Sequence, residues 1–273
     1  NYNKFIFKKI TMQSNLKIKK ISDLNRKKIL NVIDKNGYAI ISGLFERNEI
    51  NDALKNFKKK FNFKLDKAST DGTPKEIKKN FQKLCVGSAS NNTEKIYRLH
   101  RIIYNPTWAV DKYKLKKIFM RFGKIRNYFL GFSENFCLNS VENNLWSANR
   151  ILQYPVGGGH MSCHSDYILK NVSEKNNINK FYQLILLLTE KSKHYQNGGA
   201  YIIHKNKKIY IEDNTEQGDL LIYKSTVKHG VDEIDPNMKL NLSKANGRIV
   251  LMNSLYQDFT IKKSRSKFFR NLS

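Results

Sequence analysis

From residue 146 onward the chain alternates short apolar segments with turn residues, a pattern typical of antiparallel β-strands. Pro155–Gly159 (Pro-Val-Gly-Gly-Gly) and Asn197–Gly199 are two of the turn clusters. Segments of this length over about 110 residues favour a sandwich or jelly-roll barrel over alternating strand–helix units. The predicted strands are Ala148–Tyr154, Met161–Ile168, Tyr182–Thr189, Ala200–His204, Lys208–Glu212, Asp219–Tyr223 and Arg248–Tyr256.

Residues 22–62 predict a helix, a short strand and a second helix. Apolar residues recur at helical spacing after a cap in Ser22-Asp23-Leu24, and the first helix ends at Asn36-Gly37. Tyr38–Ile41 is then a short buried strand, and an amphipathic helix begins at Phe45. The further predicted elements are a polar surface loop over residues 64–95, a strand over Lys95–Tyr104 and a basic helical stretch over Val110–Phe132.

The length of 273 residues, with no segment that resembles a linker, predicts a single domain. Within it we expect a mostly helical support region over residues 1–140, a jelly-roll core over 146–258 and a basic tail over 259–273. No apolar run approaches the roughly 20 residues that span a bilayer. Cys85, Cys137 and Cys163 form no Cys-x-x-Cys pair, so we expect a reducing compartment, the cytoplasm.

The net charge of +27 is concentrated in the N-terminal half of the chain. Residues 1–126 carry 31 Lys and Arg against 10 Asp and Glu, whereas residues 127–273 carry 19 against 13. A basic surface of this kind attracts nucleic acid, anionic lipid or phosphorylated substrates. The alternative is a lysine-rich composition that only solvates the surface, so charge by itself does not identify a partner.

Chemistry-bearing residues stand at the ends of the predicted strands. His164 and Asp166 are separated by one residue, so on a strand both side chains point to the same face. His229 follows a later strand and turn, and Arg248 opens the last apolar strand. Two imidazoles and one carboxylate are the ligands that hold non-haem Fe(II) and leave coordination positions open. These residues therefore predict an oxygenase, with Arg248 placed to hold the far carboxylate of a 2-oxoacid.

The chain resembles the Fe(II)/2-oxoglutarate-dependent dioxygenases in several motifs. Gly37–Phe45, followed by an acidic helix start, resembles the N-terminal helix–strand–helix of the phytanoyl-CoA hydroxylase-like and prolyl-hydroxylase-like branches. Asn197–Ala200, Gln217–Leu221 and His229-Gly-Val231 resemble strand and turn markers of the double-stranded β-helix (jelly-roll, cupin-like) core. The resemblance implies a mainly β fold with flanking helices, in which His164, Asp166 and His229 ligate the metal. It also implies that Arg248 binds the distal carboxylate of 2-oxoglutarate.

The resemblance further implies Fe(II), 2-oxoglutarate as cosubstrate, and O₂. Tyr154, Asn149 and Ser254 lie on strands next to the ligand or arginine strands and are candidates for further cosubstrate contacts. Related halogenases carry a small residue in place of the carboxylate. Because Asp166 keeps the carboxylate, we expect a hydroxylase that releases succinate and CO₂, with desaturation and ring formation as alternatives.

Other histidines offer rival assignments. His160 and His164 flank Cys163, which suggests a zinc or redox site, but no second ligand cluster completes a tetrahedral set. Because His160 ends a glycine turn, we expect it instead at the edge of the pocket or in contact with a metal ligand. His204 is a rival to His229 as third ligand. We expect structural or surface positions for the remaining two, His194 and His100.

The sequence leaves the substrate open. We prefer a small-molecule or carrier-linked substrate, anionic if the basic N-terminal half borders the pocket. Nucleic-acid repair enzymes of this superfamily typically carry a second arginine shortly after the first, where this chain has Ser254. A nucleic-acid, protein-side-chain or glycan-lipid substrate remains an alternative. A non-catalytic alternative is a basic β-barrel module that binds RNA or membranes. A third alternative is a metal-dependent isomerase or hydrolase on a related cupin barrel.

Overall fold

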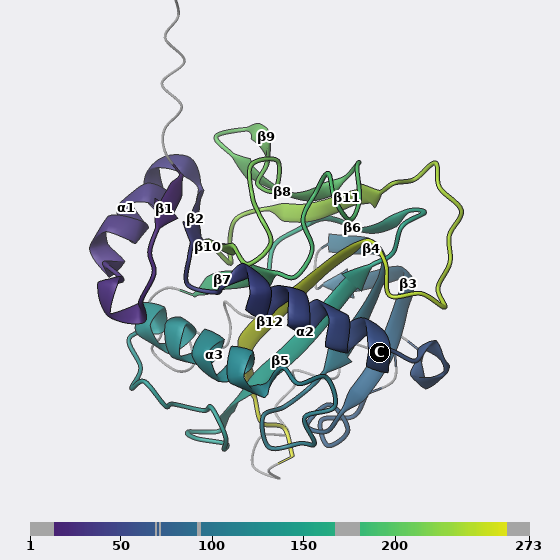
Figure 1. The fold of residues 1–273 in the computed structure, drawn as a ribbon, viewed down its shortest axis with the longest axis horizontal. Helices are drawn as coiled ribbons and strands as arrows, with labels where there is room; N and C mark the ends of the chain where they lie inside the picture. The colour runs from purple at the N-terminus through teal and green to yellow at the C-terminus, as the bar shows by residue number, and fades with distance from the viewer. Residues whose placement is uncertain (1–13, 69, 71, 92–93, 167–180, 261–273) are drawn as a thin grey trace, which may run out of the picture.

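The structure is a computed structural model that describes residues 14–68, 70, 72–91, 94–166 and 181–260 (Figure 1). Its helices are α1 (Arg26–Asn36), α2 (Arg47–Lys60) and α3 (Lys116–Leu130), with short 3-10 turns at Ile21–Asp23 and Phe63–Leu65. Its strands are β1 (Asn15–Lys17), β2 (Tyr38–Ser42), β3 (Phe81–Asn91), β4 (Glu94–Tyr104), β5 (Leu145–Tyr154), β6 (Gly159–His164), β7 (Tyr182–Leu187), β8 (Gly199–His204), β9 (Lys207–Tyr210), β10 (Leu220–Lys224), β11 (His229–Ile234) and β12 (Arg248–Gln257).

The strands form one sheet that folds back on itself. Its order is β1-β2-β10-β7-β12-β5-β4-β6-β11-β8-β9, with β3 added to β4, and all pairs except β1–β2 are antiparallel. β4 pairs with β5 through its C-terminal half and with β6 through Arg98 and Leu99, so it joins a broad half to a smaller half. The architecture is the predicted jelly roll, a double-stranded β-helix with flanking helices.

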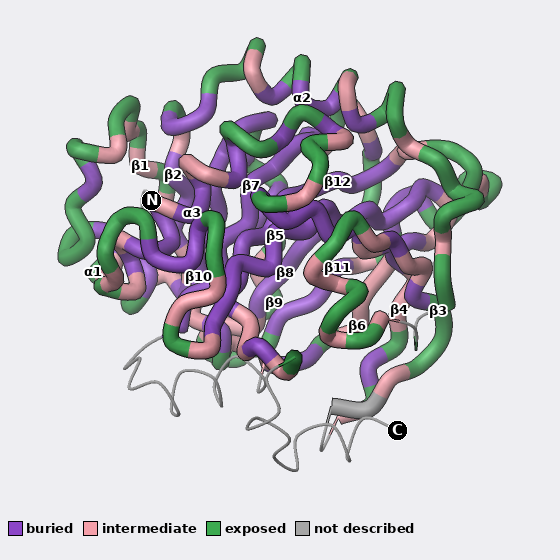
Figure 2. The backbone as a smooth tube through the Cα atoms, turned by 90° about the horizontal axis from the view of Figure 1, so that it is seen from below, coloured by how far each residue is buried: buried purple, intermediate pink, exposed green. Residues whose placement is uncertain are grey.

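Side chains alternate between two cores along each strand, as the period of two requires. On β7, Ile185 and Leu187 point between the two halves of the sheet, whereas Leu186 points outward to the helices. The inner cluster contains residues of β5, β7, β8, β10, β11 and β12. The outer cluster covers the broad half with α1, α2 and α3, and Figure 1 shows α2 and α3 across β12 and β5. Figure 2 shows this interior as a continuous buried region.

The first helix begins later than predicted. Ser22 and Asp23 lie in a 3-10 turn, and Asn25 caps α1 because its side chain accepts a hydrogen bond from the Lys28 amide. Gly37 ends the helix with φ +87°, as the Asn36-Gly37 pair predicts. The prediction of the cap was therefore wrong, and that of the helix end is confirmed.

The predicted surface loop over residues 64–95 contains a long strand, so that prediction was wrong. β3 pairs with β4 from Phe81↔Tyr104 to Asn91↔Glu94. Its second half, with Gly87 and Ser88, lacks the apolar alternation of a half-buried strand. Pairing with the next strand, β4, therefore decides its structure, because the residues of β3 alone do not. Residues 1–140 contribute strands β1–β4 as well as the expected helices.

Within the described residues, no helix combines the length and the apolar composition that a membrane span requires.

Candidate active site

Three chemistry-bearing side chains meet where β6 and β11 lie side by side. His164 ends β6, His229 begins β11, and the two residues pair directly in the sheet. Asp166 lies two residues beyond the end of β6, where its backbone amide donates to the Ser225 carbonyl at 3.2 Å. The strand thus ends before Asp166, earlier than the predicted Met161–Ile168, of which Tyr167 and Ile168 lie outside the described residues.

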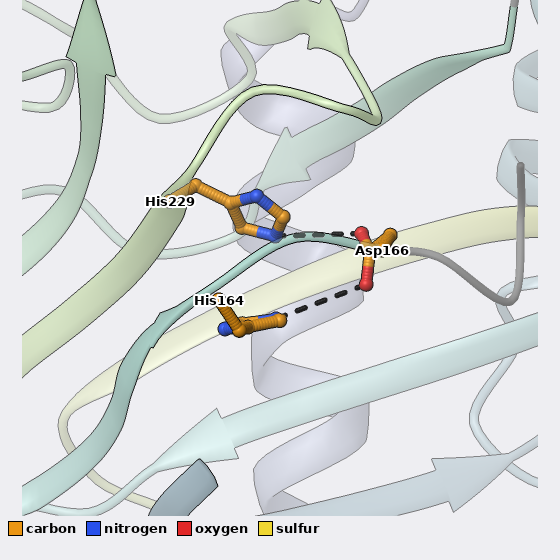
Figure 3. Close-up of side chains that lie close together, drawn as sticks. All are labelled: His164, Asp166 and His229. Atoms are coloured by element: carbon orange, nitrogen blue, oxygen red, sulfur yellow. Dashed lines mark ion pairs between the residues drawn. The ribbon is translucent and has the colours of Figure 1, made fainter. Parts of the chain in front are cut away.

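The ligand atoms of the three side chains face a common point (Figure 3). Asp166 Oδ1 is 3.7 Å from His164 Nε2, and Oδ2 is 3.4 Å from His229 Nε2. One ligand atom from each residue lies within 4.8 Å of the other two. The rings of His164 and His229 are 4.4 Å apart. This arrangement allows one small ion to contact all three residues.

Backbone carbonyls fix the tautomer of both histidines. His164 Nδ1 lies 2.8 Å from the Ser162 carbonyl, and His229 Nδ1 lies 2.8 Å from the Val227 carbonyl. Since a carbonyl oxygen only accepts, each Nδ1 carries a hydrogen when the ring is neutral. Each Nε2 then directs a lone pair toward Asp166. This donor set of two neutral imidazole nitrogens and a carboxylate fits Fe(II).

Further groups orient the carboxylate. Gln183 on β7 donates from Nε2 to Asp166 Oδ2, and Glu94 Oε2 accepts the Ser165 amide at 3.1 Å. Hydrogen bonds of this kind hold metal ligands in the required orientation. Sequence reasoning did not single out Gln183, because only the pairing of β7 with β10 and β12 brings it to Asp166.

The triad is electrostatically coupled. Burial opposes the charged form of Asp166, but His229 and His164 outweigh it and hold the pKa of the carboxyl below its usual range. Burial also opposes protonation of His229, yet Asp166 raises the pKa of that imidazole above 6.5. Burial and the neighbouring His229 lower the pKa of His164. A proton and a metal cation therefore compete for His229.

The triad opens into a cavity of about 180 Å³ between the two halves of the sheet. Its apolar wall comes from β4, β5, β6, β7, β11 and β12 and comprises Ile102, Leu152, Met161, Ile185, Val231, Val250 and Met252. Its polar wall includes Tyr154, Tyr223 and Arg248. This volume is below the roughly 300–1,000 Å³ typical of sites for drug-sized ligands, so the enclosed part suits a small molecule.

Arg248 stands in the wall of this cavity and is almost completely buried. Its Nε lies 2.9 Å from both carboxylate oxygens of Glu212, and its Nη2 lies 2.5 Å from Oε1. The Tyr195 hydroxyl and the Ala200 amide donate to the same carboxylate at 2.8 and 3.0 Å. Nη1 has no hydrogen-bond partner among the described residues. The guanidinium is thus anchored on one edge and leaves another edge for a ligand.

The three further cosubstrate candidates occupy different places. Tyr154 lines the cavity, its ring lies 5.0 Å from the Arg248 guanidinium, and burial raises its pKa to about 12, so it is a hydroxyl donor at neutral pH. Ser254 is buried and accepts a hydrogen bond from Arg150 Nη2 at 2.8 Å. Asn149 lies on the helix-facing side of β5, where its Oδ1 accepts from Asn253 at 2.6 Å. Asn149 is therefore not brought to the cavity.

The remaining histidines lie apart from the triad, with one exception. His160 bonds the Gly158 carbonyl, His204 the Lys35 carbonyl, and His194 accepts the Glu190 amide. His100, expected at a structural or surface position, is buried in the cavity wall, where burial lowers its pKa to about 3.

The fold and the triad define a jelly-roll protein built to hold a metal ion in an enclosed cavity. Residues 150–254 match the model of a family described as the 2OG-Fe(II) oxygenase superfamily. The match spans the triad and Arg248 and supports an oxidoreductase, since members of this superfamily use Fe(II), 2-oxoglutarate and O₂. No curated protein matches its sequence.

Solved structures with the same fold include two prolyl hydroxylases. One, from Trichoplax adhaerens in complex with a peptide fragment of the hypoxia inducible factor oxygen degradation domain, is 13% identical with a TM-score of 0.52, covering 89% of this chain and 93% of that one. A Pseudomonas putida prolyl-4-hydroxylase is 12% identical with a TM-score of 0.50, covering 85% and 99%. The α-ketoglutarate-dependent epimerase SnoN from nogalamycin biosynthesis is 9% identical with a TM-score of 0.50, covering 85% and 82%. At these identities the likeness is one of fold.

Proposed function

We propose that this oxygenase is a hydroxylase of a small-molecule or carrier-linked substrate, with His164, Asp166 and His229 as metal ligands and Arg248 as the cosubstrate anchor. The observation that carries the proposal is the convergence of three ligand atoms within 4.8 Å in the cavity that Arg248 also lines. A non-catalytic binding module has no need for such a set.

Three side chains would hold the metal together. His164 and His229 contribute Nε2 because their Nδ1 atoms are bonded to carbonyls, and Asp166 contributes a carboxylate oxygen. Gln183 restricts rotation of that carboxylate. With a metal held by these residues, the cavity beside the triad would receive the cosubstrate and O₂.

Arg248 suits the distal carboxylate of 2-oxoglutarate. Glu212 fixes the guanidinium plane, and the donors that remain toward the cavity can bind a carboxylate through charge-assisted hydrogen bonds. The Tyr154 hydroxyl is a further donor beside it. The buried apolar residues of the cavity wall limit access of water to Arg248 and Tyr154.

When bound, Fe(II) and 2-oxoglutarate supply the oxidation: substrate C–H, O₂ and 2-oxoglutarate give substrate C–OH, succinate and CO₂. The carboxylate of Asp166 favours hydroxylation over chemistry that needs a vacated ligand position. We therefore place hydroxylation before halogenation, with epimerisation, desaturation and ring closure as alternatives that the carboxylate allows.

Succinate production tests this proposal. Purified protein with Fe(II), 2-oxoglutarate and O₂ should release succinate slowly even without the prime substrate. The same assay should give none with Asp166→Ala, and Arg248→Met should raise the KM for 2-oxoglutarate with a smaller effect on kcat. His204→Ala serves as the matched control, since His204 lies outside the cavity. Equal succinate release by Asp166→Ala and wild type would refute the assignment.

A further inference from the structure

Two arginines that the cosubstrate and the metal do not use line the same cavity. Arg98 on β4 and Arg150 on β5 both belong to its wall. Arg150 is 9% exposed, and the Nε atoms of both side chains are buried with no hydrogen-bond partner among the described residues. Neither arginine forms an ion pair with a carboxylate in the part of the chain that the structure describes.

Arg150 is held in place by neutral groups only. Nη2 donates to Ser254 Oγ at 2.8 Å and approaches the Met252 sulfur at 4.0 Å. The guanidinium also lies 5.0 Å from the centre of the Tyr256 ring. These contacts fix the orientation of the side chain but leave its charge uncompensated.

The other buried arginines of the described chain are satisfied. Arg248 pairs with Glu212, and Arg101 pairs with Asp66 at 2.6 Å. Arg126 donates to acceptors on Asn127, Ser147, Asn253 and Phe136. Arg126 has no carboxylate partner either, but its Nε and both Nη atoms all donate, whereas the buried Nε of Arg150 has no partner among the described residues. A buried charged donor without a partner is costly, so Arg150 is the exception that requires an explanation. An anion that enters the cavity from solution would supply the missing partner.

The strand register separates this cation from the cosubstrate anchor. In the β5–β12 pairing Tyr154 lies opposite Arg248, and Arg150 lies opposite Met252. Arg150 lies four residues before Tyr154 on β5. Its backbone is therefore about 13 Å along the strand from the point where Tyr154 pairs with Arg248. Met252 also pairs with Ile185, two residues from the Gln183 that holds Asp166. Arg150 is thus at the end of the strands where the metal ligands lie.

Arg98 lines the cavity from the adjoining strand β4, six residues before the Tyr104 that pairs with Arg150. It pairs with Met161 of β6, so it stands on the strand that joins the two halves of the sheet, next to the strand that carries His164. His100, between Arg98 and the centre of β4 on the same face, stays neutral because burial lowers its pKa to about 3. The cations that β4 and β5 contribute to the cavity wall are therefore the two guanidinium groups of Arg98 and Arg150.

We propose that Arg98 and Arg150 bind an oxyanion of the prime substrate, a carboxylate or a phosphate, beside the metal centre. The inference rests on the proposed function and names its substrate class. A planar guanidinium binds both kinds of oxyanion through paired charged hydrogen bonds. The apolar wall next to Arg150 then contacts the short carbon skeleton that carries the anion.

Isothermal titration of the anaerobic Fe(II)·2-oxoglutarate protein tests the proposal with defined probes. The probes are butyrate, inorganic phosphate and the neutral analogue butyramide, measured on wild type, Arg98→Met, Arg150→Met and Arg150→Lys. Arg47→Met is the control, because Arg47 is a half-exposed arginine paired with Glu190 outside the cavity. The affinity for 2-oxoglutarate is measured on every variant.

The wild type should bind butyrate or phosphate and not butyramide, and the tighter of the two anions identifies the oxyanion. Arg150→Met and Arg98→Met should weaken that binding about tenfold to a hundredfold, while Arg150→Lys should lose less. Arg47→Met should stay within about twofold, and affinity for 2-oxoglutarate should be unchanged in all variants.

Three results would overturn the anion site: no anion binding by the wild type, equal binding by Arg150→Met, or loss of 2-oxoglutarate affinity instead, which would assign Arg150 to the cosubstrate. Failure of the proposed function is a separate result. A wild type that does not bind Fe(II) and 2-oxoglutarate, but binds the anions in an arginine-dependent way, would refute the oxygenase assignment and leave the anion site standing.

Discussion

Glu212 and Arg248, 36 residues apart in the chain, form a buried ion pair in which the carboxylate accepts from Nε and Nη2. Both side chains are 2% exposed. The pair joins the segment after β9 to the start of β12 and holds the guanidinium at the cavity. Its geometry explains how a cationic anchor is kept in an apolar interior.

Removal of the charge on Glu212 should destabilise the protein. In Glu212→Gln the Arg248 cation remains buried without a counter-ion, which costs about 3–5 kcal/mol. Urea unfolding measures the difference. Glu216→Gln is the matched control, since Glu216 forms a solvent-exposed pair with Arg47 and should cost at most about 1 kcal/mol. Equal losses in the two variants would contradict the role of the buried pair.

The same pair predicts a pH dependence. Burial would raise the pKa of Glu212, but Arg248 outweighs it and lowers the pKa below its ordinary 4.5. A carboxylate with a lowered folded-state pKa stabilises the fold above pH 4.5, and this stabilisation is lost as the pH falls through the lowered value. The difference in free energy of unfolding between wild type and Glu212→Gln should therefore shrink as the pH falls below 4.5. A difference independent of pH would refute this account.

Metal ions should stabilise the wild type through the triad. Mn(II), a redox-inert substitute for Fe(II), should raise the free energy of unfolding by about 2.7 kcal/mol at a hundred times its Kd, and chelation should reverse the effect. Asp166→Ala and His164→Ala should show no such gain. His160→Ala should behave as the wild type, since His160 bonds Gly158 outside the triad. Retained metal stabilisation in Asp166→Ala would mean that the ligand set is wrong.

Metal affinity should increase with pH. Asp166 raises the pKa of His229 above 6.5, so that imidazole must lose a proton before Nε2 can ligate a cation. The Kd for Mn(II) should fall as the pH rises through that raised value and then level off. Titrations between about pH 6 and 9, with release of protons followed in weak buffer, measure this. Affinity that is flat across this range would show that His229 is already neutral or is not a ligand.

Gln183 should contribute to metal affinity without being a ligand. Gln183→Met keeps the apolar volume but removes the donor to Asp166, and loss of such a contact typically costs about 10–100-fold in metal affinity. Gln196→Met is the control, because Gln196 is an exposed glutamine that bonds the Ser192 carbonyl away from the cavity. An unchanged Kd in Gln183→Met would assign Gln183 a packing role only.

The sequence predicts those elements that are determined by residues close together in the chain. The apolar run of β12 and the spacing of His164 and Asp166 identify strand ends that carry ligands, and Gly37 ends α1 for a stereochemical reason. These features can be predicted without knowing which strands lie beside them.

Features that depend on strand register escape such reasoning. β3 is a strand because it pairs with β4, and its own residues read as a polar loop. Arg150 shares a face with Tyr154 by the period of two, but its lack of a counter-ion is visible only when β4, β5 and β12 are placed together. The position of Asn149 depends on the same pairing, since it lies on the opposite face of β5 from Arg150 and accepts a hydrogen bond from Asn253 of β12.

The most direct test of the central claim is an anaerobic titration of the metal-free protein with Fe(II) and then 2-oxoglutarate, followed by visible absorption. We predict a metal-to-ligand charge-transfer band in the wild type that is lost in His164→Ala and needs far more 2-oxoglutarate in Arg248→Met. A folded, iron-loaded wild-type protein that gives no band with 2-oxoglutarate would contradict the account.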